Sequence, residues 1–368
     1  MFIITIIVFI FIIGILIFVH EFFHFLAAKK LGVKVEEFCL GFPPRIFKTK
    51  RGETVYSIGL FPIGGFVKLF GEEKEEKAPD SFYNKSVGTR AKITSAGFFA
   101  NFILAIILFS FCFYFGFPEA IEEKVPSKAK EIAVQIIAIA PNSPAMKADL
   151  AIGDKILKVR NFKNPKVYKE IKETQDLLNF SKANAGEEII LTIKRGKEIL
   201  EKKLIPRKDY PSSVGRVEGP IGVALIKTAI ISYPFPENIL KSFESTFFLT
   251  GATLFFFGKT IKNIIIGEKI EGVEIIGPIG IGGLVSQMIN LGLIHLLYFI
   301  AILSLNLAII NALPFPALDG GRLLFLLIEK IKKAPIKIEI ENLINQIGFI
   351  ILIILMIIIT IRDIGKLF

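Results

Sequence analysis

Cysteine and histidine are both scarce in this chain of 368 residues, which contains two cysteines and three histidines. Cys39 and Cys112 lie in very different contexts, so the sequence predicts no disulfide framework. A metal site with imidazole ligands would have to draw on His20, His24 and His295. The scarcity therefore argues against a disulfide-stabilised scaffold and leaves few candidates for a metal site.

Charge is absent from the start of the chain, because residues 1–20 contain no Lys, Arg, Asp or Glu. A secretory signal peptide carries a basic region before its apolar run, whereas here Lys29 and Lys30 follow it. Cleavage would also remove His20 and His24. We expect a retained first membrane span, with the N-terminus outside and the two lysines at the cytoplasmic face.

Hydrophobic residues, by contrast, are abundant. They make up 52% of the chain, which includes 36 phenylalanines and has a mean hydropathy of +0.58. These values indicate several membrane spans. The net charge of +11 comes from basic residues spread over loops next to apolar segments, and no nucleic-acid-binding motif accompanies it. Contact with anionic membrane lipids explains this charge better than a nucleic-acid partner.

The fold class that follows is a polytopic α-helical membrane protein with about four transmembrane helices. The four segments long and apolar enough to span are 2–28, 93–117, 291–313 and 346–361. A membrane-associated β-hairpin is expected within 29–92, where residues 53–69 read as strand, turn and strand. We expect four divisions: a first membrane part at 1–117, an α+β domain with its flanks at 118–236, an interfacial region at 237–290 and a second membrane part at 291–368.

The α+β domain is predicted to be small and rich in strands, with an amphipathic helix over 167–178. Residues 239–266 are apolar but flanked by charge, and their uncharged stretch is only 245–258. That stretch is short for a bilayer core of about 30 Å. A fifth span here would also place the region after 291–313 on the side opposite His20 and His24. We therefore expect an interfacial or re-entrant helix.

The motif His20-Glu21-Phe22-Phe23-His24 lies near the end of the first apolar segment. Residues four apart project from one face of a helix, so the two imidazoles can share a metal ion. Glu21 is placed to activate water at that metal. The histidines would lie roughly 13 and 7 Å inside the cytoplasmic face, at about 1.5 Å of rise per residue. We therefore hypothesise that the motif forms a hydrolytic metal site within the membrane.

A third ligand is needed for such a site. His295 lies toward the opposite end of its span, about 27 Å of helix away, which favours an interfacial role. Asp319 is better placed, because Pro314 and Pro316 break the helix before it and glycines after it let the backbone turn. An acidic residue beyond such a break is a functional candidate.

These motifs together resemble the site-2 protease family of intramembrane zinc metalloproteases, in particular the bacterial branch that carries a PDZ domain. The resemblance rests on His20-Glu21-x-x-His24 and on Asn311-x-x-Pro314-x-Pro316-x-Leu318-Asp319-Gly320. Further stretches similar to family elements are 40–45, 64–68, 96–101, 144–156 and 277–281. Phe98 stands where the family usually has proline before Asn101, and one PDZ-like module fits where some members have two.

The resemblance implies that Zn²⁺ is the cofactor, that His20, His24 and Asp319 bind it, and that Glu21 is the general base. It implies that Asn311 positions the substrate or polarises its carbonyl. It also implies that the hairpin residues clamp an unwound substrate as an added strand. The hairpin residues concerned are Gly65, Phe66, Val67 and Lys68.

The implied substrates are single-span membrane proteins, such as anti-sigma factors or remnant signal peptides. The implied location is the bacterial inner membrane, with the PDZ-like domain outside as a filter for trimmed substrates. For the hairpin, the alternative is an ordinary surface turn. For the PDZ-like domain, the alternative is a plain folded spacer.

Two other classes of function stay open at this point. One is a PDZ-bearing membrane scaffold with a non-catalytic metal site, although the presence of both Glu21 and Asp319 argues against it. The other is a metal transporter. A transporter would usually show an internal repeat and polar groups along a path through its spans, and the sequence shows neither.

Overall fold

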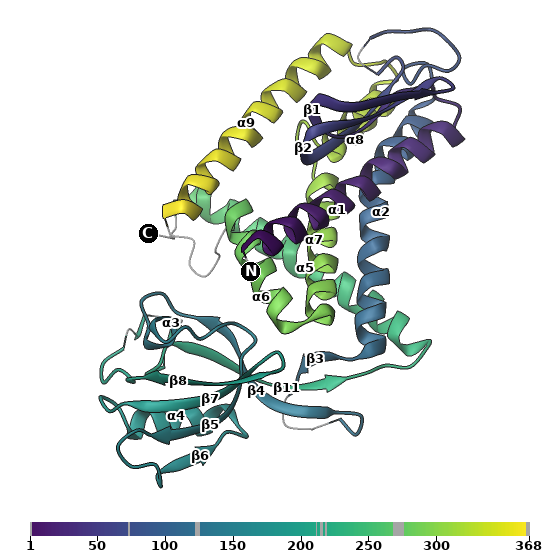
Figure 1. The fold of residues 1–368 in the computed structure, drawn as a ribbon. Helices are drawn as coiled ribbons and strands as arrows, with labels where there is room; N and C mark the ends of the chain where they lie inside the picture. Colours follow the sequence, from purple (N-terminus) through teal and green to yellow (C-terminus); the bar gives the residue numbers. More distant parts are fainter. Residues whose placement is uncertain are drawn as a thin grey trace. The chain divides into compact units, whose positions relative to one another are not determined.

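The structure is a computed structural model, and Figure 1 shows its fold. It describes residues 2–72, 74–121, 126–210, 212–213, 216–217, 219–267 and 276–365. The chain forms two compact units. The first consists of Met1–Phe109, Ser242–Val285 and Tyr298–Phe368, and the second of Ser110–Lys241 and Ser286–Leu297.

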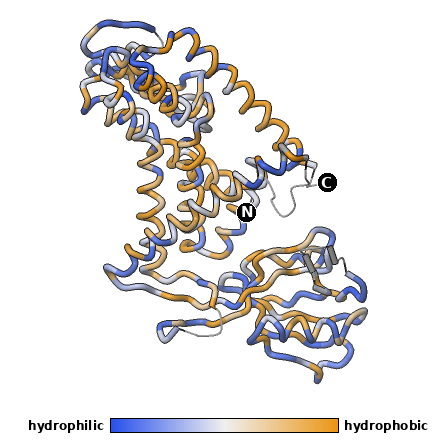
Figure 2. Tube along the Cα trace, turned by 180° about the vertical axis from the view of Figure 1, so that it is seen from behind, coloured by the Kyte–Doolittle hydropathy of each residue, from blue (hydrophilic) through white to orange (hydrophobic). Residues whose placement is uncertain are grey.

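Within the described part of the chain, four helices are long and apolar enough to cross a membrane: α1 (Phe2–Lys30), α2 (Val87–Phe115), α7 (Leu293–Ala312) and α9 (Ile338–Gly365). In Figure 2 the long helices are hydrophobic along most of their length. Each overlaps one of the four predicted spans, and α9 begins eight residues before the predicted start. The predicted polytopic helical architecture is confirmed.

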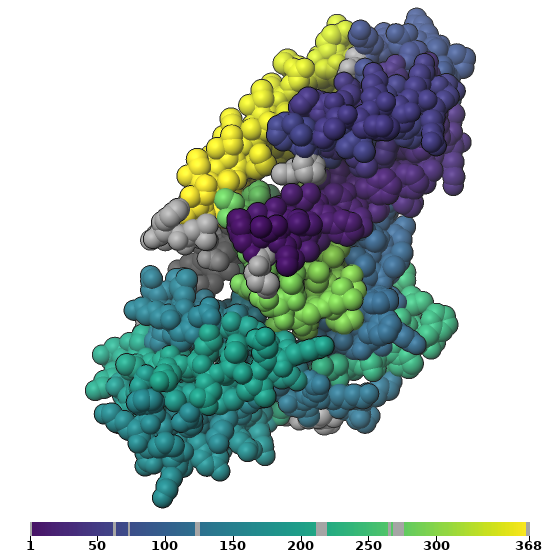
Figure 3. Space-filling model, in the orientation of Figure 1, coloured from purple at the N-terminus to yellow at the C-terminus, as the bar shows by residue number. Residues whose placement is uncertain are grey.

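Helix α9 is the least covered of the four. Its buried residues are Ile338, Gly348 and Asp363. Figure 3 shows it uncovered along its length on the face in view. Exposed isoleucine and leucine side chains over 350–358 suit contact with lipid rather than with water.

The predicted interfacial segment is one continuous helix, α5 (Glu237–Ile266), which is 30 residues long but is not among the described helices that are apolar enough to cross a membrane. Residues 268–275 of the predicted interfacial region lie outside the described residues. The other helices of the described chain are α3 (Pro144–Lys147), α4 (Thr174–Ala183), α6 (Pro278–Leu291) and α8 (Asp319–Lys332).

The hairpin is formed by β1 (Val35–Arg51) and β2 (Thr54–Leu69), which pair antiparallel and fold back on themselves. Residues 37–40 pair with 55–58 on one side and with 65–68 on the other. The chain therefore reverses between 58 and 65, where the turn was predicted. Residues 65–69 pair on one side only among the described strands, which makes them an edge strand.

Helix α1 packs against this hairpin through aromatic rings. Phe25 lies 5.5 Å from Phe38 and 6.0 Å from Tyr56 between ring centroids, and Phe18 lies 6.2 Å from Phe38. Edge-to-face contacts between aromatic rings add stability beyond that gained by burying the rings. They hold the hairpin against the helix that carries the histidine motif.

The second unit contains the predicted α+β domain. Its main sheet has the strand order β3-β11-β4-β5-β7-β8, with β6 paired to β5. The strands of this sheet and of a separate small hairpin are β3 (Phe117–Ala120), β4 (Lys130–Ile139), β5 (Lys155–Asn161), β6 (Tyr168–Glu170), β7 (Ile189–Arg195), β8 (Glu198–Leu204), β9 (Ser212–Ser213), β10 (Arg216–Val217) and β11 (Val223–Ile231). Buried aliphatic residues such as Val134, Ile156 and Leu191 form its core with Leu177 of α4.

One prediction within this domain was wrong. Residues 167–178 were expected to form a single helix, but Tyr168–Glu170 is a strand, and α4 begins only at Thr174. Backbone pairing of Tyr168 with Arg160 on β5 outweighs the helical pattern. The helix then starts at the capping box of Glu173 and Asp176.

Candidate metal centre

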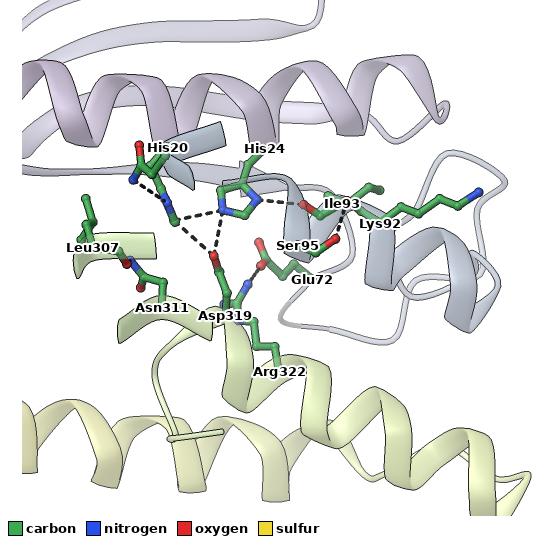
Figure 4. Close-up of polar contacts among 11 residues, drawn as sticks. His20, His24, Glu72, Lys92, Ile93, Ser95, Leu307, Asn311, Asp319 and Arg322 are labelled. Atoms are coloured by element: carbon green, nitrogen blue, oxygen red, sulfur yellow. Dashed lines mark hydrogen bonds and ion pairs between the residues drawn. The ribbon is translucent and has the colours of Figure 1, made fainter. Parts of the chain in front are cut away.

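His20 and His24 lie one turn apart on α1, and both side chains point to the same side of the helix (Figure 4). Their Nε2 atoms are 3.2 Å apart. His20 is buried and His24 is largely so. The helical spacing read from the sequence thus produces a pair of converging imidazole nitrogens.

Asp319 completes the group from the first turn of α8. Its Oδ2 lies 3.2 Å from Nε2 of both histidines, and Figure 4 shows the carboxylate directed at the two rings. Ligand atoms of a tetrahedral zinc ion, at about 2.0–2.1 Å from the metal, lie about 3.3 Å apart. Two imidazoles and one carboxylate with these separations fit the donor set of a catalytic zinc site.

The position of Asp319 follows from the break between two helices. Helix α7 ends at Ala312 and α8 begins at Asp319, with Ala317 at φ 72° in the turn. A Cβ on Gly320 would lie 2.2 Å from the Leu313 carbonyl oxygen, so only glycine allows the chain to double back this closely. A carboxylate at a helix N-terminus is also favoured by the helix dipole.

Helix α2 lies against the two histidines. The Nδ1 of His24 is 2.8 Å from the Ile93 carbonyl oxygen, and the Nδ1 of His20 is 3.4 Å from the Asn101 amide nitrogen. Gly97 lies between Ile93 and Asn101 in the sequence, and a Cβ on Gly97 would be 2.2 Å from Nε2 of His24. The close approach of α2 therefore requires glycine at this position.

The metal-ligand candidates open into a cavity of about 740 Å³. Glu21 lines this cavity, as do Phe66, Val67 and Lys68 of the edge strand. Gly65 lies against Glu21, since a Cβ on Gly65 would be 3.1 Å from Glu21 Cγ. The structure thus brings the proposed base, the metal-ligand candidates and the edge strand together.

Asn311 is placed differently from the other predicted site residues. Its side-chain amide donates to the Leu307 carbonyl at 3.0 Å, and it is not among the described residues that line the cavity. Its role in catalysis therefore stays a prediction.

One wall of the cavity was not predicted from the sequence. Asn342, Asn345, Gln346 and Phe349 of α9 line it, at the spacing of one helical face. Asn345 accepts a hydrogen bond from the backbone N–H of Ala317, in the turn before Asp319. Three amides at this spacing could have been noticed in the sequence, but they lie before the span predicted at 346–361 or at its first residue.

A second missed feature is the ion pair between Arg322 and Glu72, both of which line the cavity. Arg322 lies one turn after Asp319 on α8, and Glu72 follows the edge strand. This ion pair ties the helix that begins at Asp319 to the hairpin. Sequence separation of 250 residues gives no local signal for it.

The hairpin is stabilised by an ion pair and a hydrogen bond at the carboxylate of Glu37. Arg45 donates through Nε and Nη2 to the carboxylate of Glu37, at 2.6 Å each, and Ser57 donates to the same carboxylate at 2.6 Å. The hydrogen bonds from Arg45 hold the pKa of Glu37 below its usual value, with Ser57 acting in the same direction against the opposing effect of burial.

Comparison with known proteins agrees with this geometry. The family model for "Peptidase family M50" matches residues 8–355. "Putative zinc metalloprotease CPE1693" of Clostridium perfringens is 34% identical over 350 residues, covering 95% of each chain. "Regulator of sigma-E protease RseP" of Salmonella typhimurium is 31% identical over 448 residues, again covering 95% of each chain.

Among solved structures, the chain is similar to the PDZ domain of an SdrC-like protein from Listeria monocytogenes. The match has 17% identity and a TM-score of 0.20, and covers 28% of this chain and 92% of that one. This likeness is too low to assign the domain, so its PDZ-like identity stays a prediction. The family match over nearly the whole chain is decisive by itself: the chain belongs to peptidase family M50, the site-2 proteases.

Proposed function

We propose that this protein is a zinc-dependent intramembrane endopeptidase in which His20, His24 and Asp319 hold the metal and Glu21 is the general base. The observation that carries the proposal is the convergence of three donor atoms, 3.2 Å apart, beside Glu21 in one cavity. The names of the relatives as proteases favour catalysis over the scaffold and transporter alternatives.

Zinc bound in this site would polarise the peptide carbonyl and make water a better nucleophile. The Glu21 carboxylate takes a proton from the attacking water as its oxygen bonds to the carbonyl carbon. Glu21 then gives that proton to the amide nitrogen as the carbon–nitrogen bond breaks, leaving a carboxylic acid and an amine, and the remaining proton of the acid ends on the amine. Its place in the cavity that both histidines line, and against Gly65, suits this shuttle.

The substrate would be presented as a strand. A transmembrane helix hides its carbonyls in internal hydrogen bonds, and unwinding it in hydrocarbon costs several kcal/mol for each unsatisfied backbone group. Residues 65–69 pair on one side only among the described strands, and residues 66–69 line the cavity. Pairing with this edge replaces the lost hydrogen bonds and aligns a carbonyl beside Glu21.

Asn311 would position the substrate or polarise its carbonyl. In the structure its amide is engaged with the Leu307 carbonyl, so this role requires the side chain to rotate. The substrate class we propose is single-span membrane proteins, including membrane-bound regulators such as anti-sigma factors, since a relative is named a regulator of sigma E.

The divisions at 1–117, 118–236, 237–290 and 291–368 remain part of this proposal, with the α+β domain and the N-terminus outside a bacterial inner membrane and the metal near its cytoplasmic face. The domain would select trimmed substrates by size. Deleting 128–208 should then let uncleaved, full-length substrates be cut while the chemistry survives. Loss of all activity from a folded protein would contradict the filter role.

The assignment of roles is tested with purified protein in detergent. Glu21→Gln should keep wild-type zinc content and lose cleavage of a single-span substrate, because it removes the base and leaves the ligands. His24→Ala and Asp319→Asn should lose zinc and cleavage together. Normal cleavage by Glu21→Gln, or full zinc content in both ligand variants, would show the assignment to be wrong.

A further inference from the structure

We infer that Asn101 is a positioning residue that fixes the ring of His20 so that its Nε2 faces the metal. The inference rests on the proposed function and concerns residues outside the metal-ligand group. It assigns a physical task to one face of α2, formed by Ile93, Gly97 and Asn101 at intervals of four residues.

The geometry places Asn101 behind His20. Its side-chain amide nitrogen is 3.4 Å from His20 Nδ1, the ring nitrogen on the side opposite the metal-ligand group. Asn101 is 0% exposed, and its Oδ1 has no hydrogen-bond partner among the described residues. A buried amide oxygen without a donor is unusual and costs free energy.

The chemistry of a metal-binding histidine explains this unpaired oxygen. An imidazole that binds a metal through Nε2 carries its proton on Nδ1, and that N–H needs an acceptor. His24 has one, because the Ile93 carbonyl oxygen is 2.8 Å from its Nδ1. For His20, the hydrogen-bond contact at Nδ1 found among the described residues is with the side chain of Asn101.

The acceptor is supplied by turning the amide of Asn101. The oxygen and nitrogen of an asparagine amide have nearly the same shape, and their assignment follows from the hydrogen bonds they make. With Oδ1 toward His20, the Nδ1–H of His20 donates to it. The oxygen without a partner then gains its donor, and His20 is held in the tautomer that a metal requires.

The backbone of Asn101 is fixed independently of this contact. Ser304 of α7, which is 0% exposed, donates through Oγ to the Asn101 carbonyl at 2.8 Å. Removing the Ser304 hydroxyl would loosen the contact between α2 and α7 without touching His20. Ser304 therefore separates a packing role of Asn101 from a positioning role.

The test measures zinc affinity of the full-length protein in detergent by competition with a chelator, and the visible spectrum after cobalt substitution. Asn101→Leu should weaken zinc binding by about 10–100-fold, as is typical when the partner of a metal-binding histidine is removed. It should also change the cobalt spectrum. Asn101→Asp, which keeps an acceptor for Nδ1–H, should bind zinc within about threefold of the wild type. Ser304→Ala should do the same.

Two results would overturn the inference. One is zinc affinity and a cobalt spectrum in Asn101→Leu that match the wild type. The other is an equal loss in Ser304→Ala, which would mean that Asn101 acts only through helix packing. If Asn101→Leu lowers the unfolding temperature, Asn101→Ala replaces it in the same comparison.

The failure of the proposed function would look different. In that case the wild type itself would not bind zinc, or Asp319→Asn would bind it as well as the wild type. Both measurements are made alongside the Asn101 variants, so a wrong metal site and a wrong positioning residue give distinct results.

Discussion

Adding one methyl group at Gly97 should destroy the metal site while leaving the helix intact. A Cβ on Gly97 would lie 2.2 Å from His24 Nε2 and 2.7 Å from His20 Cε1, whereas real Cβ contacts are essentially never shorter than 3.0 Å. The ring of His24 must therefore move by at least about 0.8 Å, several times the ±0.2 Å tolerance of a metal–ligand distance.

The ring cannot move at no cost. His24 is held at Nδ1 by the Ile93 carbonyl, and Asp319 lies at its Nε2. A displacement of this size breaks one contact or the other. We expect Gly97→Ala to weaken zinc binding by at least about 100-fold, the upper end of what is lost when a group that orients a ligand is removed.

The assay is chelator competition for zinc on the purified full-length protein, with the unfolding temperature measured in parallel. Gly88→Ala is the matched control, because Gly88 is on the same helix and a Cβ there has no atom within 4 Å. Alanine is favoured over glycine in a helix by about 1 kcal/mol at both sites, so propensity does not distinguish them. Wild-type zinc affinity in Gly97→Ala would refute the packing of α2 against the two histidines.

Two further predictions concern stability. Arg195 donates to the fully buried carboxylate of Asp154 at 2.7 and 2.8 Å, so Arg195→Met should leave that charge unpaired and destabilise the α+β domain by about 3–5 kcal/mol, measured by thermal unfolding of the full chain. Unchanged unfolding would contradict this. Arg45 lowers the pKa of Glu37 in the folded state, so the ionised Glu37 carboxylate stabilises the fold at pH values above its unfolded pKa. This stabilisation is lost as the pH falls through the folded pKa. The protection factors of the hairpin amides, which are corrected for the pH dependence of the intrinsic exchange rate, should therefore fall below about pH 4.5 in the wild type, and Arg45→Met should remove much of that dependence.

The convergence of His20, His24 and Asp319 could be predicted from the sequence because its geometry is encoded locally. Spacing of four residues places His20 and His24 on one helical face, and the prolines and glycines around Asp319 specify a break. The four spans could be predicted because hydrocarbon thickness sets their length.

The rest of the site depends on contacts that carry no local signal. The Ile93 partner of His24 is a backbone carbonyl, which any residue offers. The importance of Gly97 comes from the approach of another helix, and the pairing of Arg322 with Glu72 joins distant parts of the chain. Residues 168–170 form a strand because β5 is beside them, although their own pattern favours a helix.

We propose that this protein cleaves a substrate protein within the membrane-spanning segment of the substrate. The most direct measurement is mass-spectrometric mapping of the products when the wild type and Glu21→Gln, in lipid vesicles, are given a single-span substrate. We expect a cut inside the apolar segment that needs zinc and disappears in Glu21→Gln. A cut confined to residues outside the segment, or one that persists in Glu21→Gln, would contradict it.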